Sequence, residues 1–251
     1  MPRIRLLLIL LFSFSARIAA ADFVQCTPDA QAGTKCEVQI EELRPTQPEV
    51  GKREIGFKTE KYGDLREKNP SEFQALKVKK IVPIIIGPDG RYYLIDHHHS
   101  TLAFWEVDEK NAYVVVKENW SKSWRGLPLK KRMMKFWAKM EKSGHAWLER
   151  ENGVRVDPMS PEWPQNLAEC GNNRLRSLVW DLIHQGYIDK KEIHYFEFLI
   201  AKYLQSQGIK VEKGEYDKAF HAAVEIVQSD SGRRATRNIN CLEDVLKPFS
   251  R

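Results

Sequence analysis

The segment Asp96-His97-His98-His99-Ser100 places one carboxylate, three imidazoles and a hydroxyl in consecutive positions. Histidine exchanges a proton near neutral pH, and its ring N–H donates hydrogen bonds to anions. Asp96 can fix the tautomer of an imidazole, cap backbone N–H groups or hold a cation. Consecutive residues point in different directions, so the three rings cannot all bind one metal. A divalent cation held by two histidines and a distant carboxylate stays open, as does a capping role alone for Asp96.

The neighbouring elements place this segment at the start of a helix. Two apolar runs, 82–86 and 92–95, are separated by Gly87-Pro88-Asp89-Gly90 and predict a pair of strands. Residues 101–106 indicate the beginning of a helix. Backbone N–H groups at a helix N-terminus are unpaired and carry positive partial charge, which favours a phosphate or carboxylate there. The sequence therefore predicts an anion site directly after Ile95.

The rest of the chain predicts an α/β (α+β) fold with a helical C-terminal region. A strand begins at 38–40, a short helix over 70–80 has Ser71 as its cap, and a further strand covers 113–116. After Trp120 the apolar residues recur with helical period, in stripes over 129–140, 175–183, 193–203 and 216–227. The third of these helices is expected to begin at Asp189, because Glu192 follows at the spacing of a capping box.

Four segments are expected along the chain. They are a signal peptide over 1–21, an α/β module over 22–118, a helical region over 119–230 and a polar, basic tail over 231–251.

Residues 1–21 have the features of an export signal. Arg3 and Arg5 precede an apolar run over 6–14, and Ala19 and Ala21 have the spacing that a signal peptidase requires. The run is too short to span a bilayer, although an uncleaved anchor is the alternative. We expect a secreted or periplasmic protein without stable membrane insertion after cleavage. Without this segment, 37 basic and 34 acidic residues leave a formal charge of +3 instead of +6, which weakens any argument for nucleic acid from charge alone.

Export also favours disulfides among the four cysteines, because the count is even and the compartment oxidising. Cys26 and Cys36 flank a turn-rich stretch and are suited to staple a hairpin, which leaves Cys170 and Cys241 to pair across a long loop. This connectivity is one of three. No spacing typical of a zinc site competes with it.

Three stretches of the chain resemble one family. Residues 82–104, VPIIIGPDGRYYLIDHHHSTLAF, resemble the central motif of ParB-like proteins, and more closely that of ParB-like nucleases whose turn reads Asp-His-His-His. Upstream, residues 43–58 (LRPTQPEVGKREIGFK) resemble the leading Leu-Arg-Pro-Thr-Gln, Val-Gly and Glu-aliphatic elements of that family. Downstream, Arg176-Ser177-Leu178 and Phe196-Glu197-Phe198 resemble its Arg-Ser-Leu and Phe-x-Glu-Phe elements.

The resemblance implies a ParB/sulfiredoxin-like α/β fold that binds a phosphate group at the turn formed by Asp96, His97, His98 and His99. Glu54 occupies the acidic position used by nucleases and free-serine kinases of the superfamily. Two departures stand out. The arginine that ends the turn in partitioning proteins is replaced by His99 or Ser100, and the Asp-Pro-aromatic pattern expected before Arg176 is absent.

The leading functional hypothesis is a phosphodiesterase or nuclease, a hydrolase acting on a phosphate-containing substrate. The phosphate would lie on the N–H groups after Asp96, beside Ser100, with one of His97, His98 and His99 donating to it. Glu54 would act as general base, and Arg176 or Arg44 would offset developing negative charge. The alternatives are an exposed Glu54 and merely structural ion pairs for the two arginines, with Glu197 as a partner for Arg176.

Two other functions stay open. One is a small-molecule kinase of the free-serine type, against which export argues because ATP is scarce outside the cytoplasm. The other is a non-catalytic module that binds phosphate or nucleic acid. Its candidate surface is the basic segment 122–150 with Trp124, Trp137 and Trp147, although Trp137 also lies on an apolar helical stripe typical of a core.

Overall fold

A five-stranded mixed sheet forms the centre of the computed structural model, which describes residues 23–237. The strands are β1 (Lys35–Gln39), β2 (Leu43–Arg44), β4 (Val82–Ile86), β5 (Tyr92–Leu94) and β6 (Asn111–Asn119), in the order β1-β6-β4-β5-β2. The β1–β6 and β4–β5 pairs are antiparallel, whereas the β4–β6 and β2–β5 pairs are parallel. The α/β fold expected from the sequence is confirmed.

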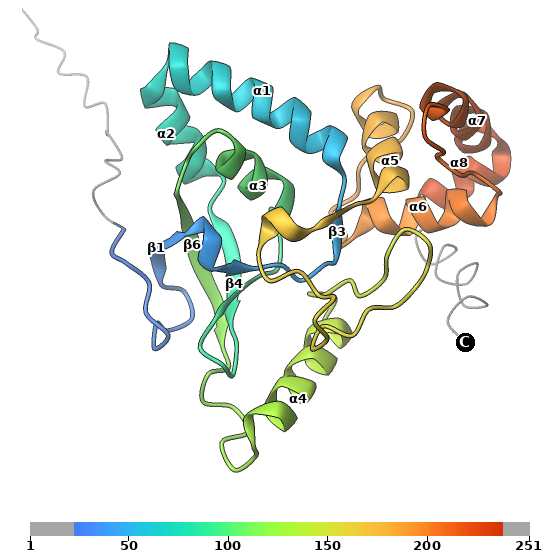
Figure 1. Cartoon of the computed structure of the whole chain (residues 1–251). Helices are drawn as coiled ribbons and strands as arrows, with labels where there is room; N and C mark the ends of the chain where they lie inside the picture. The colour runs from blue at the N-terminus through green and yellow to red at the C-terminus, as the bar shows by residue number, and fades with distance from the viewer. Residues whose placement is uncertain (1–22, 238–251) are drawn as a thin grey trace, which may run out of the picture.

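The alternation of side chains along β4 and β5 supplies two separate cores, because successive strand residues face opposite sides of a sheet. Ile84, Ile86 and Leu94 pack on one side with residues of the helices α1 (Lys52–Lys68), α2 (Pro70–Lys79) and α3 (His98–Glu106). Ile85 and Tyr93 pack on the other side with α4 (Leu129–Lys142). Figure 1 shows these helices around the sheet.

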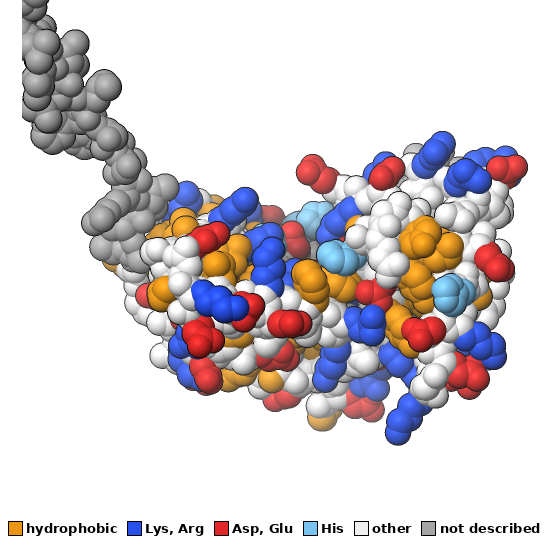
Figure 2. Space-filling model, turned by 90° about the horizontal axis from the view of Figure 1, so that it is seen from above, with side chains coloured by type: hydrophobic (Ala, Val, Ile, Leu, Met, Phe, Trp, Pro, Cys, Tyr) orange, Lys and Arg blue, Asp and Glu red, His pale blue; other side chains and the backbone are white. Residues whose placement is uncertain are grey.

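The C-terminal helices form a third core beside the sheet. These helices are α5 (Arg174–His184), α6 (Phe196–Ser206), α7 (Tyr216–Gln228) and α8 (Asp230–Arg237). A 3-10 turn, Leu167–Glu169, and a two-stranded parallel sheet of β3 (Glu49–Val50) and β7 (Gly171–Asn172) connect this part to the start of α1. Seen from above, basic, histidine and apolar side chains lie together between the part with α1 to α3 and the part with α5 to α8 (Figure 2).

Several local expectations are wrong. Helix α6 begins at Phe196, so the proposed capping box at Asp189 and Glu192 does not form, and Ile193 is 41% exposed instead of buried. The cap of α2 is Asn69, whose side chain accepts from the Glu72 backbone N–H, and not Ser71. Helix α1, over 52–68, is present although the sequence pattern does not predict it. Residues 231–237 of the polar, basic tail belong to helix α8, which does not test the boundary of that segment.

The signal segment 1–21 and the last part of the tail, which includes Cys241, lie outside the described residues, so the Cys170–Cys241 pairing stays a prediction, as do the segment boundaries. Within residues 23–237, no helix combines the length and apolar character that spanning a bilayer requires.

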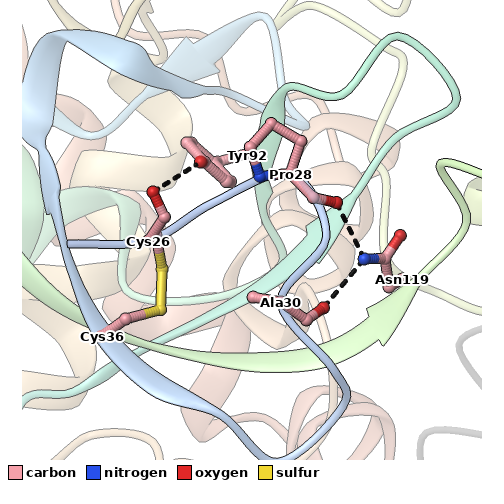
Figure 3. The surroundings of a disulfide bond; sticks show 6 residues. All are labelled: Cys26, Pro28, Ala30, Cys36, Tyr92 and Asn119. Atoms are coloured by element: carbon pink, nitrogen blue, oxygen red, sulfur yellow. Dashed lines mark hydrogen bonds between the residues drawn. A yellow bond between two sulfur atoms is a disulfide. The ribbon is translucent and has the colours of Figure 1, made fainter. Parts of the chain in front are cut away.

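A disulfide joins Cys26 to Cys36, with a Cα–Cα distance of 5.1 Å, and closes the loop that enters β1 (Figure 3). The same loop is tied to the sheet by hydrogen bonds. The Tyr92 hydroxyl donates to the Cys26 carbonyl at 3.2 Å, and the Asn119 amide donates to the carbonyls of Pro28 and Ala30 at 3.0 and 2.8 Å. The disulfide therefore holds the edge strand β1 in a loop that is already bound to β5 and β6.

Replacing both Cys26 and Cys36 by serine is expected to lower the free energy of unfolding by about 3 kcal/mol, because the cross-link restricts a short loop in the unfolded chain. Denaturant unfolding with and without reductant measures this. The wild type should become as unstable as the double variant on reduction, and the double variant should not respond. Equal stability of oxidised wild type and double variant would contradict the prediction.

Candidate functional site

The turn between β5 and α3 has an unusual backbone at His97. This residue is the N-cap of α3 and adopts the left-handed conformation, with φ 66° and ψ 17°, which is uncommon for a residue other than glycine. Asp96 does not cap the helix as expected. Its Oδ1 accepts from the His97 backbone N–H at 2.6 Å instead, and the Thr101 hydroxyl donates to the His97 carbonyl at 2.9 Å. These two hydrogen bonds stabilise the turn in this conformation.

His98 and His99 are buried and position the loop before α1. The Thr46 backbone N–H donates to His98 Nε2 at 3.2 Å, and the Gly51 backbone N–H donates to His99 Nε2 at 2.9 Å. A ring nitrogen that accepts from an N–H carries no proton, so both rings are neutral, with the proton on Nδ1. Burial lowers the pKa of His98 to about 4 and holds that of His99 well below its ordinary value. Both rings therefore serve as hydrogen-bond acceptors within the fold.

The His97 ring is the third imidazole, and it is differently placed. It is half-buried, lines a cavity, and forms no hydrogen bond with any of residues 23–237. Burial lowers its pKa, and the charges of Lys80, Lys58 and Lys190 lower it further, although Asp96 opposes them. Of the three histidines, His97 is the one whose ring is available to a ligand.

Glu54 and Arg176 meet in a buried ion pair beside the turn. Glu54 lies in the first turn of α1 and is 7% exposed, and its Oε2 is 2.5 Å from Arg176 Nη1 on α5. Lys58, one helical turn after Glu54, contacts Glu54 Oε1 at 2.5 Å and donates to the Ser100 hydroxyl at 3.0 Å. His99 Nδ1 lies 4.0 Å from Glu54 Oε2. The exposed-glutamate alternative for Glu54 is therefore wrong, and Glu54 and Arg176 both reach the histidine turn.

The charges around Glu54 keep it ionised. Burial alone would raise the pKa of Glu54, but the positive charges of Arg176 and Lys58 and the hydrogen bond from Lys58 outweigh it and hold that pKa below its ordinary value. On the far side of the guanidinium, Arg176 Nη2 lies 3.5 Å from Glu197 Oε1, which also accepts from Lys190 at 2.8 Å. The pair expected between Arg176 and Glu197 is thus present, as one link in a chain of alternating charges.

Carboxylates hold Arg176 on two sides. Its Nη1 contacts Glu54 Oε2 and its Nη2 faces Glu197 Oε1, whereas its Nε is buried without a hydrogen-bond acceptor among the described residues. The guanidinium therefore stays in place as one of the basic groups of the site.

A cavity of about 480 Å³ opens over these groups. Its basic lining residues are Lys58, Lys80, Arg176, Lys190 and Lys191. Lys80 forms no ion pair within the described part of the chain, and burial and the nearby charges of Lys58, Lys79 and Lys190 lower its pKa. Because like charges repel one another here, an anion in the cavity would relieve the repulsion. Figure 2 shows basic and histidine side chains close together on one face of the molecule.

The structure brings most of the predicted site residues together, but not all. Asp96, His97, His98, His99, Ser100, Glu54 and Arg176 all line the cavity. Arg44 lies elsewhere: it donates to the Gln165 carbonyl and lines a different cavity with Asp89 and Tyr93. In the basic segment 122–150, Trp137 is 5% exposed and belongs to the core, and Trp147 stacks on Phe198 at 5.2 Å. The core alternative for Trp137 is therefore confirmed, and this ring is not part of an exposed binding surface.

Sequence reasoning missed several residues that complete the site. Lys80 and Lys190 supply charge, and Gly51 supplies a backbone N–H to His99. The Tyr195 hydroxyl lies 3.3 Å from the Thr46 hydroxyl, which is itself 3.2 Å from His98 Nε2. A signal existed for Lys58, which follows Glu54 at the i,i+4 spacing of a helical ion pair. Among the described residues, no group of three or more His, Cys, Asp or Glu side chains is arranged to hold a metal ion.

The comparisons with known proteins agree with this architecture. The crystal structure of protein Atu1540 from Agrobacterium tumefaciens is similar over 80% of this chain and 94% of that chain, with a TM-score of 0.65 and 26% sequence identity. A family described as "Putative ParB-like nuclease" matches residues 36–206, which include the sheet, the histidine turn and helix α6 up to its end. The chain therefore belongs to the ParB-like nuclease family. No curated protein matches it.

Gly51 is expected to tolerate no side chain. A Cβ at this position would lie 2.7 Å from Arg176 Cδ and 2.9 Å from its Nη1, whereas a Cβ at Gly56, in the same region of α1, would meet nothing within 4 Å. Gly51→Ala should therefore displace Arg176 and lower stability by about 1–3 kcal/mol. Gly56→Ala should raise it by about 0.5–1 kcal/mol, because alanine favours the helix. Thermal unfolding of the two variants compares them directly, and equal shifts would contradict the close packing at Gly51.

Stability is expected to fall between pH 7 and pH 5. The folded-state pKa of His98 is about 4, below the unfolded value near 6.5, so the unfolded chain takes up a proton in this range and the folded chain does not. His98 alone should reduce the free energy of unfolding by about 2 kcal/mol over this interval. Denaturant unfolding at several pH values measures the slope. His98→Gln should flatten it, and an unchanged slope in that variant would exclude His98 as the cause.

Proposed function

We propose that this chain is a nuclease-type phosphodiesterase whose reaction takes place in the cavity over the histidine turn. The observation that carries the proposal is the gathering of mutually repelling lysines around Lys80 in one cavity, beside the guanidinium of Arg176. This lining favours a bound anion, and the available imidazole of His97 lies in the same cavity. Phosphate groups match this arrangement, because guanidinium and ammonium groups bind them through charge-assisted hydrogen bonds.

The proposed reaction is hydrolysis of a phosphodiester. Water attacks phosphorus, the bond from phosphorus to the leaving oxygen breaks, and the proton lost by the water passes to a base. Arg176 and the lysines hold the non-bridging oxygens and offset the charge that develops on them. A phosphate in the cavity offsets the lysine charges that lower the pKa of His97, so His97 takes up a proton from solvent and then donates it to the leaving oxygen. When a phosphate attracts Lys58 and Arg176, Glu54 loses part of the positive field that keeps its pKa low, which suits it to accept the proton of the water.

The location of this activity is also a proposal. The signal-like segment 1–21 and the Cys26–Cys36 disulfide support export to the periplasm or the cell exterior, because disulfides persist in oxidising compartments.

Purified protein is expected to cleave single-stranded and duplex oligonucleotides or bis(4-nitrophenyl) phosphate, assayed with Mg²⁺, with Mn²⁺ and with chelator. His97→Asn should lower kcat by about 10²- to 10⁴-fold, since it removes the proton donor. Lys80→Gln should raise KM. The matched controls are His221→Asn and Lys213→Gln, which alter an exposed histidine and an exposed lysine outside the cavity lining. Both controls should retain wild-type kinetics.

An NMR titration separates binding from catalysis. Inorganic phosphate should raise the pKa of His97, because it neutralises the lysines that lower that pKa in the free protein. Lys80→Gln should raise the pKa of His97 in the absence of phosphate. A pKa of His97 that responds to neither change would exclude the cavity as the phosphate site. Salt-dependent binding without turnover by any substrate would identify a binding module instead of an enzyme.

A further inference from the structure

Three aromatic rings form a surface cluster on α1 and α5. The rings of Phe57 and Trp180 are 5.4 Å apart, those of Phe57 and His184 are 4.9 Å apart, and those of Trp180 and His184 are stacked at 4.8 Å with an interplanar angle of 11°. Phe57 is 44% exposed and His184 is exposed, while Trp180 is partly exposed. Phe57 and Trp180 belong to none of the three hydrophobic cores. The core packing therefore does not account for this cluster.

The cluster lies next to the cavity, along both helices that build it. Phe57 follows Glu54 by three residues on α1, and Trp180 follows Arg176 by four residues on α5. Side chains at these spacings are neighbours on a helix surface, with Cβ atoms about 5–6 Å apart. On α1, Phe57 lies one helical turn after Glu54, and on α5, Trp180 lies one helical turn after Arg176. The aromatic cluster is therefore one turn away from the Glu54–Arg176 pair on both helices.

Positive charge continues in the same direction. Lys58 lines the cavity directly beside Phe57, and Lys61 lies one turn beyond Phe57 on α1. Lys61 is exposed and has no ion-pair partner within residues 23–237. Arg53 is different, because it is paired with Asp181 at 2.6 Å and lies over the Tyr216 ring at 4.2 Å. The order along α1 is therefore a phosphate-binding cavity, an aromatic cluster and a further lysine.

We infer that Phe57, Trp180 and His184 form a base-stacking platform for single-stranded nucleic acid, an inference that rests on the proposed phosphodiesterase site. With one phosphate in the cavity, the adjoining base lies against the platform and the next phosphate along the strand reaches Lys61. Alternating phosphate and aromatic contacts are the usual way in which proteins bind unpaired strands. A duplex does not fit this platform, because its bases are already stacked inside the helix. The platform thus selects unpaired strands over duplexes.

The test compares two fluorescent oligomers of equal length, oligothymidylate and an abasic oligodeoxynucleotide, by anisotropy with the full chain. Both carry the same phosphate charge, and only the first carries bases. The wild type should bind oligothymidylate about ten-fold to a hundred-fold more tightly. Phe57→Ala and Phe57→Leu should remove most of this difference and leave the affinity for the abasic oligomer unchanged. Trp180→Phe should retain it, since an aromatic ring remains. Tyr187→Ala, which alters a tyrosine that is 38% exposed and packs on Phe220, is the matched control and should bind both oligomers as the wild type does.

The outcomes separate the platform from the phosphate site. Equal affinity of the wild type for the two oligomers would overturn the platform, and so would a Phe57→Leu variant that keeps the preference for bases. If Lys80→Gln still weakens binding of both oligomers in that case, the phosphate site stands without the platform. Failure of the wild type to bind either oligomer would overturn the proposed function as well. Circular dichroism of each variant shows whether a loss of binding reflects unfolding, and Phe57→Leu, which keeps an apolar side chain, serves where Phe57→Ala is unstable.

Discussion

The buried contact between Glu54 and Arg176 is the interaction on which the site depends. It joins α1, which packs on the sheet, to α5, which belongs to the C-terminal helical core. Two charges withdrawn from water are stable only when their neighbours complete the pairing, and loss of one partner leaves an uncompensated charge that costs about 3–5 kcal/mol. Lys58, Glu197 and Lys190 complete it here. The contact therefore fixes the two halves of the cavity relative to each other and keeps the Arg176 guanidinium in the cavity lining.

The three consecutive histidines have separate tasks because the backbone changes direction at His97. The left-handed residue keeps its own ring in the cavity, while the first turn of α3 directs His98 and His99 inward to accept the N–H groups of Thr46 and Gly51. An accepting imidazole must stay neutral, and burial maintains that state. The rings of His98 and His99 thereby fix the loop that leads into α1. This loop in turn fixes the position of Glu54 relative to the ring of His97. The run of histidines is in this sense one structural unit and not three copies of a catalytic group.

The sequence predicted the parts of this arrangement that depend on local pattern. Strands β4 and β5 and their turn were predictable because two continuous apolar runs flank the turn residues Gly87-Pro88-Asp89-Gly90. Helix α1 was not predictable in this way, since two glycines and few apolar residues weaken its pattern, and its buried members include Glu54. Asp189 and Glu192 have the spacing of a capping box, but α6 begins at Phe196 and residues 190–195 line the cavity instead. The need for glycine at position 51 depends on Arg176, 125 residues later, and no local pattern contains that information.

The charge balance of the cavity bears on the kind of phosphate that fits it. Its five basic residues face four acidic ones, Glu54, Asp96, Glu192 and Glu197, so the lining has a formal charge of only +1 with neutral histidines. A phosphomonoester carries close to two negative charges at neutral pH, whereas a diester carries one. The carboxylates repel the second charge, and in a partly buried site such repulsion is weakly screened. A diester also continues beyond the cavity on both sides of phosphorus, which the aromatic cluster at Phe57 and the lysine beyond it can use. The electrostatics of the cavity and the surface beside it thus agree with the ligand that we propose, an internal phosphodiester of an unpaired strand.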